Sequence, residues 1–336
     1  MTHKIAINGF GRIGRMIFRI LENNPGLEVV AINDLTDPDM LAHLLEFDSV
    51  HGRFDAPVTV KDGAIEVNGR TIHTSAERNP ADLPWAKLGV DLVLECTGVF
   101  RNKETASAHL DAGAKKVIIS APAKGGIDHT IVMGVNDETY NPEEHHIVSN
   151  GSCTTNCLAP VVKVIDEQFG VQCGVMTTIH SYTNDQRLLD LPHSDKRRAR
   201  AAAMSMIPTS TGAAKAISLV MPHLEGRLDG LAVRVPTPNV SLVDVVLTTK
   251  NTVTQASVNQ ALAAAADGPL KGILGFETRP LVSTDFIGSA FSSVVDAENT
   301  KVMGDNLVKV LTWYDNEWGF SCRMVDLANL MLSGQR

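Results

Sequence analysis

Three glycines near the N-terminus, Gly9, Gly11 and Gly14, limit the possible folds of this chain more than any other residues do. A short apolar run, Lys4–Asn8, comes directly before them and is typical of a β-strand. The segment that follows carries apolar residues at helical spacing, from Ile13 onward. A strand, a glycine turn and a helix in this order predict the first part of a βαβ unit.

The spacing of these glycines is typical of a dinucleotide-binding turn. Gly9 permits the tight turn, Gly11 lets the backbone approach a pyrophosphate, and Gly14 lets the helix and strand pack closely. The pyrophosphate then lies at the helix N-terminus, where free N–H groups favour negative charge. The next apolar run, Leu27–Asp34, ends in an acid about 20 residues further on, as such sites require. An acid there accepts hydrogen bonds from ribose hydroxyls and repels a 2′-phosphate, so we expect NAD rather than NADP. The alternative, a glycine-rich turn beside a surface acid, leaves the agreement of these features unexplained.

The remainder of the first half predicts a parallel sheet covered on both faces. Two further apolar runs, Val90–Glu95 and Lys116–Ser120, are separated by helical stretches. Between Arg53 and Thr74 the apolar residues alternate with polar ones, which indicates an antiparallel excursion.

The second half has a different pattern. We expect strands at Cys173–His180, Gly230–Val235, Val240–Leu247 and Leu307–Tyr314, with one helix at Val253–Ala266. Long connections between them favour a mixed or antiparallel sheet. The connection from His180 to Pro208 is rich in Arg, Asp and Ser, and a connection of this length is usually functional. Ser321–Leu332 is predicted to form a terminal helix.

The predicted fold class is α/β: a Rossmann-type domain with a doubly wound parallel sheet, and an α+β catalytic domain with a mixed or antiparallel sheet. A length of 336 residues suits two packed domains.

Composition excludes several classes of function. With 30 Lys and Arg against 38 Asp and Glu, the net charge of −8 argues against a dedicated nucleic-acid binder. No apolar run approaches the roughly 20 residues of a membrane helix. The N-terminus passes straight into a predicted strand, which leaves no room for a signal peptide, so we expect a cytoplasmic protein.

Five cysteines without a secretion signal indicate reduced thiols rather than disulfides. No Cys-x-x-Cys or His-x-x-x-His pattern occurs, so no structural zinc is expected. Cys173 and Cys322 fall within strand or strand-end patterns and are interpreted as buried, inert thiols.

Cys153 is the candidate nucleophile. The segment Ser149–Cys157 is rich in small and hydroxyl residues and leads into an apolar run, which predicts a helix with Cys153 in its first turn. A helix N-terminus lowers the pKa of a thiol from about 8.5. His180 closes an apolar strand and is a candidate base, although spacing alone does not prove the pairing. Cys157, one turn later on the same side, is a second candidate whose deeper position favours packing.

Two groups of basic residues allow more than one interpretation. Arg234 lies within an apolar strand, so its charge needs a partner, either a bound anion or a structural acid. The run Lys196–Arg200 is a solvated loop or a weak RNA-binding patch.

Three motifs together resemble phosphorylating glyceraldehyde-3-phosphate dehydrogenases: Asn8–Arg15, Ser149–Cys157 and Trp313–Gly319. The resemblance extends from Lys4 to the last helix. One departure is Gly151, where the family usually has Ala; this change removes no functional group.

The resemblance implies a thioester mechanism. Cys153 attacks the substrate aldehyde, hydride passes from the resulting hemithioacetal to NAD, and inorganic phosphate releases the thioester as an acyl phosphate. His180 activates the thiol, takes the hydroxyl proton and helps to stabilise the oxyanion. The resemblance also implies that the substrate is glyceraldehyde 3-phosphate.

Further site residues are implied by matching positions in the family's motifs. Those expected at the substrate phosphate are Thr183, Arg234 and Arg198. Those expected at the attacking phosphate are Ser152, Thr154, Thr211 and Gly212. Those expected at NAD are Gly9, Gly11, Arg12, Ile13, Gly14, Asp34, Arg78, Ser120 and Asn316.

The resemblance also implies an arrangement of domains and subunits. The NAD-binding domain comprises residues 1–150 and 317–336, because the last helix packs back on it, and the catalytic domain comprises residues 151–316. Leu191 and Pro192 resemble the residues found at these positions in the NAD-specific members of the family. In the family, the segment that contains them lies at a subunit interface, which implies a homotetramer. Two other functions stay open: the same chemistry on another phosphorylated aldehyde such as erythrose 4-phosphate, with hydrolysis in place of phosphorolysis, and an inactive nucleotide-binding scaffold.

Overall fold

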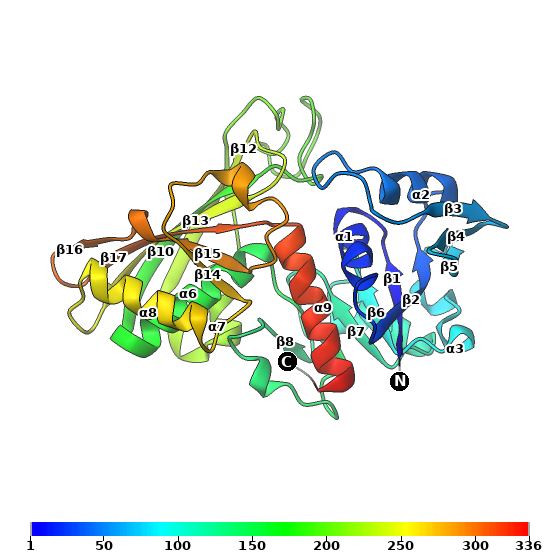
Figure 1. Cartoon of the computed structure of the whole chain (residues 1–336), viewed down its shortest axis with the longest axis horizontal. Helices are drawn as coiled ribbons and strands as arrows, with labels where there is room; N and C mark the ends of the chain where they lie inside the picture. Colours follow the sequence, from blue (N-terminus) through cyan, green and yellow to red (C-terminus); the bar gives the residue numbers. More distant parts are fainter. Residues whose placement is uncertain (1, 335–336) are drawn as a thin grey trace. The chain divides into compact units, whose positions relative to one another are not determined.

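The computed structural model describes residues 2–334 (Figure 1). The chain divides into two compact units. The first contains the described parts of Met1–Ile131, Glu138–Gly151 and Ser321–Arg336; the second contains Val132–Asp137 and Ser152–Phe320.

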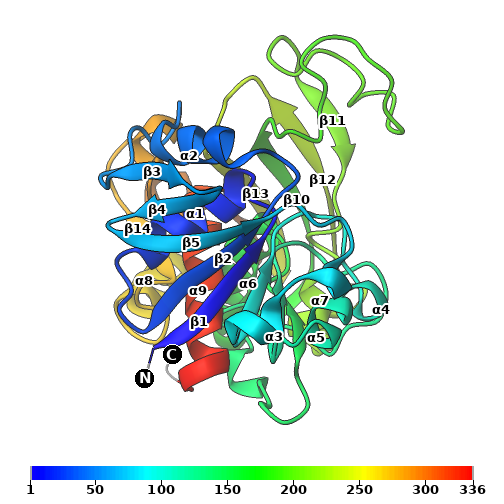
Figure 2. The same ribbon diagram turned by 90° about the vertical axis from the view of Figure 1, so that its right-hand side faces the viewer.

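The first unit is built on a mostly parallel sheet. Its strands are β1 (His3–Asn8), β2 (Leu27–Asn33), β3 (Val58–Lys61), β4 (Ala64–Val67), β5 (Arg70–Ser75), β6 (Leu92–Glu95), β7 (Lys116–Ile119), β8 (His129–Thr130) and β9 (Ile147–Ser149). They are arranged in the order β3-β4-β5-β2-β1-β6-β7-β9-β8, and the part from β3 to β1 is visible in Figure 2. Pairing is parallel except in the hairpins β3–β4 and β4–β5, which confirms the antiparallel excursion predicted between Arg53 and Thr74.

Short helices accompany this sheet. They are α1 (Arg12–Leu21), α2 (Pro38–Glu46), α3 (Trp85–Leu88), α4 (Lys103–Ala106) and α5 (Ala108–Asp111), with single 3₁₀ turns at Pro80–Asp82 and Asp137–Thr139. The C-terminal helix α9 (Trp318–Ser333) belongs to this unit from Ser321 onward.

The strand order places a topological switch point at β1. The chain goes from β1 to β2 on one side and later returns to β6 on the other. Open α/β sheets bind ligands at the carboxyl ends of the strands that flank such a point. The glycine turn follows β1 directly, so it lies at this edge.

The second unit contains a mixed sheet with helices packed on it. Its main strands are β10 (Val171–Ser181), β11 (Ile207–Ser210), β12 (Leu228–Val235), β13 (Ser241–Thr249), β14 (Leu274–Glu277), β15 (Ser293–Asp296) and β17 (Leu307–Tyr314), with β16 (Lys301–Met303) paired to β17. Its helices are α6 (Cys153–Phe169), α7 (Ile217–Val220) and α8 (Gln255–Asp267), with 3₁₀ turns at Pro222–Leu224, Ser283–Phe286 and Ala297–Asn299. The two sheets confirm the predicted fold class.

The core of the second unit lies between α6 and the sheet. Helix α6 packs against α8 and against β13, β15 and β17. In β13 the side chains of Val243, Val245 and Leu247 alternate into this core, while α6 contributes Leu158 and Ile165. This packing fixes the position of α6, and therefore of the residue at its first turn.

The prediction for two cysteines was wrong. Cys173 is exposed, because the first half of β10 presents much of its surface to solvent. Cys322 lies in α9 rather than at a strand end, since that helix begins at Trp318, and its side chain is half-buried. None of the described helices has both the length and the hydropathy to cross a membrane.

Candidate active site

Cys153 is the first residue of α6, as the sequence predicts. The helix is capped by Ser152, whose hydroxyl accepts a hydrogen bond from the backbone N–H of Thr155 at 2.9 Å. A capped helix holds its first turn in place, and the thiol of Cys153 therefore has a fixed position.

His180 lies near the end of β10, with its Nε2 at 3.5 Å from Sγ of Cys153. The imidazole is buried, with 4% of the residue exposed. The spacing of 27 residues between the two gave no proof of a pair; the packing of α6 on the sheet produces it.

Arg234 completes this group from the neighbouring strand. β10 and β12 run parallel, and their register places His180 opposite Arg234. The Nη1 of Arg234 lies 2.8 Å from Nδ1 of His180 and donates to the carbonyl of Ser181 at 3.0 Å.

The tautomer of His180 depends on which of these neighbours its Nδ1 engages. The carbonyl of Ser181 lies 2.7 Å from Nδ1 and accepts a hydrogen bond from it in the tautomer that is protonated on Nδ1. That tautomer leaves a lone pair on Nε2, directed at the sulfur of Cys153. In the other tautomer Nδ1 accepts from Arg234, and Nε2 carries the proton instead.

The expected lowering of the Cys153 pKa is not what the structure gives. Burial raises the pKa of the Cys153 thiol, and the charge of Arg234 with the hydrogen bonds at the helix start opposes this only in part. Burial, followed by the charge of Arg234, lowers the pKa of His180 to about 3. In the chain alone the two groups are thus a thiol and a neutral imidazole. The helix N-terminus does favour the thiolate, but desolvation is the larger effect.

Cys157, the second candidate, is fully buried and lies beside Ser293 and Thr312. Burial raises its pKa to about 12. A thiol that is neither accessible nor ionised cannot serve as a nucleophile, so the structure favours Cys153.

Tyr314 and Thr178 were missed in the sequence analysis. The hydroxyl of Tyr314 lies 2.9 Å from the hydroxyl of Thr154 and 2.8 Å from that of Thr178, and its ring contacts His180 edge-on. Burial raises the pKa of Tyr314 well above its usual value. Thr178 could have been predicted to lie near the site, because residues two apart in a strand share a face and Thr178 precedes His180 by two residues in β10.

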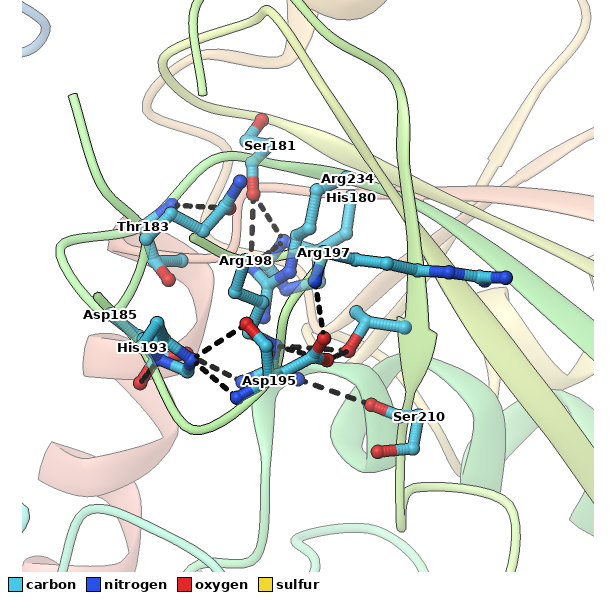
Figure 3. A network of polar contacts seen from close by, with 12 residues as sticks. His180, Ser181, Thr183, Asp185, His193, Asp195, Arg197, Arg198, Ser210 and Arg234 are labelled. Atoms are coloured by element: carbon cyan, nitrogen blue, oxygen red, sulfur yellow. Dashed lines mark hydrogen bonds and ion pairs between the residues drawn. The ribbon is translucent and has the colours of Figure 1, made fainter. Parts of the chain in front are cut away.

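The long connection between β10 and β11 carries Arg198, which is held by several acceptors (Figure 3). Its guanidinium pairs with Asp185 at 2.5 Å and donates to the hydroxyl of Thr209 at 2.9 Å and the carbonyl of Ser210 at 3.2 Å. A carboxylate oxygen of Asp195 lies 3.7 Å from Nε of the same guanidinium. The side chain of Arg197, by contrast, points away from this cluster (Figure 3).

The other predicted anion-site residues have more modest contacts. The backbone N–H of Thr183 donates to the side chain of Gln186. Thr183 lies three residues after His180 in the chain. The hydroxyl of Thr211 accepts from the backbone of Ala213 at 3.2 Å, and a Cβ on Gly212 would meet open space. Thr155 of α6 reaches the carbonyl of Ala213 at 3.5 Å, which brings this segment to the start of α6.

In the first unit the glycine turn has the features of a dinucleotide site. A Cβ on Gly9 would lie 2.6 Å from the backbone nitrogen of Thr97, and one on Gly14 would lie 2.3 Å from the carbonyl of Gly9. A Cβ on Gly11 would meet nothing, and this residue caps α1 without a side-chain hydrogen bond. The backbone at Gly11, where α1 starts, is therefore uncovered within the described residues, as the approach of a phosphate to a helix N-terminus requires.

Asp34 and Arg12 border this turn. One carboxylate oxygen of Asp34 accepts from the backbone of Phe10 at 2.8 Å, and the other accepts from Thr36 at 3.0 Å. Each oxygen retains acceptor capacity for a hydroxyl. Arg12 pairs with Asp48, and hydrogen bonds from His51, Arg12 and Val50 outweigh burial and lower the pKa of Asp48 to about 2.

The remaining predicted cofactor residues are placed as follows. Ile13 is half-buried in α1, and Arg78 is exposed in the segment after β5. Ser120 follows β7, and its backbone N–H donates to the carbonyl of Glu95. Asn316 belongs to the second unit, and its amide oxygen accepts from Ser241 at 2.8 Å. Within the described residues there is no cluster of three His, Cys, Asp or Glu side chains arranged to hold a metal ion.

Comparison with known proteins agrees with this arrangement. Residues 3–103 match the family model "Glyceraldehyde 3-phosphate dehydrogenase, NAD binding domain", and residues 152–316 match "Glyceraldehyde 3-phosphate dehydrogenase, C-terminal domain".

Curated relatives are similar over almost the entire chain. The glyceraldehyde-3-phosphate dehydrogenase of Geobacillus stearothermophilus is 60% identical over 333 residues, which is 99% of each chain. Glyceraldehyde-3-phosphate dehydrogenase 1 of Bacillus subtilis is 61% identical over 328 residues, or 98% of each chain. The enzyme of Cereibacter sphaeroides is 57% identical over 333 residues, covering 98% of this chain and 99% of its own. A family model on each half and identities of this size lead to one conclusion: the chain belongs to the glyceraldehyde-3-phosphate dehydrogenase family.

Proposed function

We propose that this protein oxidises D-glyceraldehyde 3-phosphate with NAD and inorganic phosphate, giving 1,3-bisphosphoglycerate. The observation that carries the proposal is the 3.5 Å approach of Cys153 Sγ and His180 Nε2 at the start of α6, beside the guanidinium of Arg234. A thiol, a base and a cation together suit covalent catalysis on a phosphorylated aldehyde.

The first step is attack of Sγ on the aldehyde carbon. Nε2 of His180 takes the thiol proton and returns it to the former carbonyl oxygen, which becomes the hydroxyl of a hemithioacetal. The backbone N–H of Cys153, at the helix start, stabilises the developing oxyanion. NAD, when bound, supplies the acceptor for the hydride that leaves this carbon. His180 takes the hydroxyl proton, and the product on Cys153 is a thioester.

Inorganic phosphate then attacks the thioester carbon, and Sγ of Cys153 leaves as the thiolate. A thioester conserves the free energy of the oxidation if water is excluded. Burial of His180 at 4% exposure supports a site with little water behind the base.

We assign Arg234, Thr183 and Arg198 to the substrate phosphate. The buried Nε of Arg234 has no hydrogen-bond partner among the described residues, which supports an anion as its missing partner. An anion there also offsets the charge that lowers the pKa of His180, so substrate binding makes this base stronger.

We assign Ser152, Thr154, Thr211 and Gly212 to the attacking phosphate. The contact between α6 and the segment after Thr211 supports this grouping. The hydroxyl of Thr154 already engages Tyr314, so we expect its contribution to come through the backbone.

For NAD we assign the glycine turn with Arg12 and Ile13 to the pyrophosphate and nicotinamide, and Asp34 to the ribose. Arg78 and Ser120 are assigned further along the cofactor, and Asn316 to the carboxamide. The residues present fit the dinucleotide, because the turn is open at Gly11 and closed at Gly9 and Gly14. We further propose that the first unit is the NAD-binding domain, with the second as the catalytic domain.

We also propose a cytoplasmic homotetramer. Cys96, Cys153, Cys157 and Cys173 form no disulfide, which supports a reducing compartment. Leu188, Leu189 and Met204, in the connection after β10, are 71–80% exposed in the single chain, and a second copy of the chain would cover them.

The test is NADH formation from glyceraldehyde 3-phosphate with and without inorganic phosphate, run beside NADP and beside erythrose 4-phosphate. We expect turnover that requires phosphate, prefers NAD and is lost in Cys153→Ala but kept in Cys157→Ala. Turnover that is independent of phosphate, or faster on erythrose 4-phosphate, would exclude the proposed reaction.

A further inference from the structure

Five buried polar side chains form a continuous chain of contacts in the first unit. Three of them end neighbouring parallel strands: Asn33 ends β2, Asn8 ends β1 and Glu95 ends β6. His109 lies in α5, and Trp85 begins α3. None is more than 5% exposed. We call this set the buried relay.

The contacts of the buried relay are short. Nδ2 of Asn33 donates to Oδ1 of Asn8 at 2.7 Å, and Nδ2 of Asn8 donates to Oε2 of Glu95 at 2.5 Å. Nε2 of His109 lies 3.0 Å from the same carboxylate oxygen. Nε1 of Trp85 donates to Nδ1 of His109 at 3.1 Å.

One end of the relay is fixed by the backbone. The N–H of Glu77 donates to Oδ1 of Asn33 at 2.9 Å, and the carbonyl of Glu77 accepts from Nδ2 of the same amide. Asn33 therefore presents a donor to Asn8. Asn8 in turn must direct its oxygen to Asn33 and its nitrogen to Glu95.

The other end is fixed by an indole. Trp85 can only donate, so Nδ1 of His109 accepts and carries no proton. The imidazole proton is then on Nε2, directed at Glu95. Asn8 Nδ2 and His109 Nε2 lie 3.4 Å apart and converge on one oxygen as two donors.

Both oxygens of Glu95 are thus acceptors. Oε2 receives Asn8 and His109, while Oε1 receives the backbone N–H of Thr97 at 2.8 Å and its hydroxyl. The N–H groups of Asn8, His109 and Thr97 cannot act as acceptors, so together they fix the orientation of the carboxyl group. A buried polar group is costly to leave unpaired, so a specific use for this arrangement is expected.

The relay adjoins the predicted cofactor residues of the first unit. Asn8 precedes Gly9, Asn33 precedes Asp34, and Glu77 precedes Arg78. Glu95 also holds Thr97, whose backbone nitrogen would lie only 2.6 Å from a Cβ on Gly9. The relay therefore links the turns that follow three neighbouring strands.

We propose that Glu95 is a positioning residue for the NAD site. Through Asn8 and Asn33 its carboxylate sets the spacing of the turns that receive the dinucleotide. His109, held by Trp85, supplies the second donor that keeps the carboxylate in place. This inference rests on the proposed use of NAD.

The first test is Glu95→Gln. In one orientation its amide nitrogen faces Asn8 and His109, and in the other it faces the backbone N–H of Thr97. Because these donors cannot reverse, we expect at least about tenfold weaker binding of NAD, measured by calorimetry on the intact protein. The alkylation rate of Cys153 by iodoacetamide, and kcat at saturating NAD, should stay within about twofold of wild type.

The matched control is Asp91→Asn. The carboxylate of Asp91 accepts a hydrogen bond from the backbone N–H of Lys4 at 2.9 Å. This bond joins β1 to the residue before β6, at the amino ends of these two strands. The control should bind NAD as wild type does.

The second test is a double-mutant cycle with Trp85→Phe. Without the indole donor, His109 can carry its proton on Nδ1 and accept at Nε2 from the new amide. Glu95→Gln should therefore cost less NAD affinity in the Trp85→Phe background than in the wild type. An equal loss in both backgrounds, or affinity loss in Asp91→Asn as large as in Glu95→Gln, contradicts the proposal.

A third test reads the tautomer of His109 in the wild-type relay. Solid-state ¹⁵N spectra of histidine-labelled protein, with His109 assigned by its absence in His109→Gln, should show a neutral ring protonated on Nε2. A proton on Nδ1 overturns the donor assignment. Failure of wild-type protein to bind NAD contradicts the proposed function instead, whereas normal binding in Glu95→Gln contradicts only the role of Glu95.

Discussion

Arg234 acts on both members of the catalytic pair. Its charge lowers the pKa of Cys153, which favours the thiolate, and lowers the pKa of His180, which disfavours the imidazolium. It thereby keeps His180 available as a neutral base while it moderates the effect of burial on the thiol. A bound substrate phosphate reduces both effects at once.

Arg234→Leu should therefore shift the alkylation of Cys153 to higher pH. Thiolate forms as pH rises through the thiol pKa, and loss of the cation raises that pKa, so the midpoint of the rate against pH moves upward. The measurement is iodoacetamide alkylation of the unliganded protein from neutral to alkaline pH. Arg197→Leu, which removes the same charge from a side chain directed away from the cluster, should leave the midpoint unchanged. A midpoint shift that is equal in both variants contradicts the role of Arg234.

Single residues of the site were predictable where their type was unusual for the pattern around them. A cysteine at a helix start and an arginine in an apolar strand both stand out. The contact of His180 with Arg234 depends on the parallel register of β10 and β12, which no local pattern contains. Tyr314 was missed because a tyrosine in a buried strand looks like ordinary core until its hydroxyl partners, Thr154 and Thr178, are known.

Helix α6 holds the nucleophile through its first turn, so its cap contributes to reactivity as well as to stability. Ser152→Ala removes the acceptor for the N–H of Thr155 and should cost about 1 kcal/mol of unfolding free energy. It should also slow the alkylation of Cys153 near neutral pH, since the hydrogen bonds at the helix start lower the pKa of the thiol.

The matched control is Thr254→Ala, which removes the equivalent cap of α8. Denaturant unfolding should show a similar loss of stability in both variants, whereas only Ser152→Ala should change the alkylation rate. Equal alkylation in the two variants would show that the first turn of α6 does not depend on its cap.

Helices and strands were predictable where the pattern was long or strict. Leu307–Tyr314 was predicted with the bounds that the structure has, because alternation persists through all of β17. Strands β14, β15 and β16 were missed, since runs of three or four residues do not establish a period. The start of α9 was placed three residues late, because the turn residues Asp315 and Asn316 obscure the point at which the helix begins.

The apolar side chains of the connection after β10 bear on the assembly of the molecule. Leu188 is 79% exposed in the single chain and lies in the same connection as the exposed Leu189 and Met204, a grouping that favours a surface covered by another copy. Leu188→Asp should therefore weaken the proposed tetramer, raising the protein concentration needed for assembly at least about tenfold. Sedimentation velocity measures this. Met303→Asp, at a residue that is 68% exposed on β16, is the control and should leave assembly unchanged. A wild-type monomer, or a tetramer unaffected by Leu188→Asp, contradicts the proposed interface.

Trapping the acyl enzyme tests the chemistry of the intact molecule most directly. The protein is mixed with glyceraldehyde 3-phosphate and NAD in the absence of inorganic phosphate, quenched in acid, and analysed by mass spectrometry of its peptides. We predict a burst of about one NADH per subunit, with the acyl group on Cys153 and its release on addition of phosphate. A burst with Cys153 unmodified, or with the acyl group on Cys157, would contradict the account.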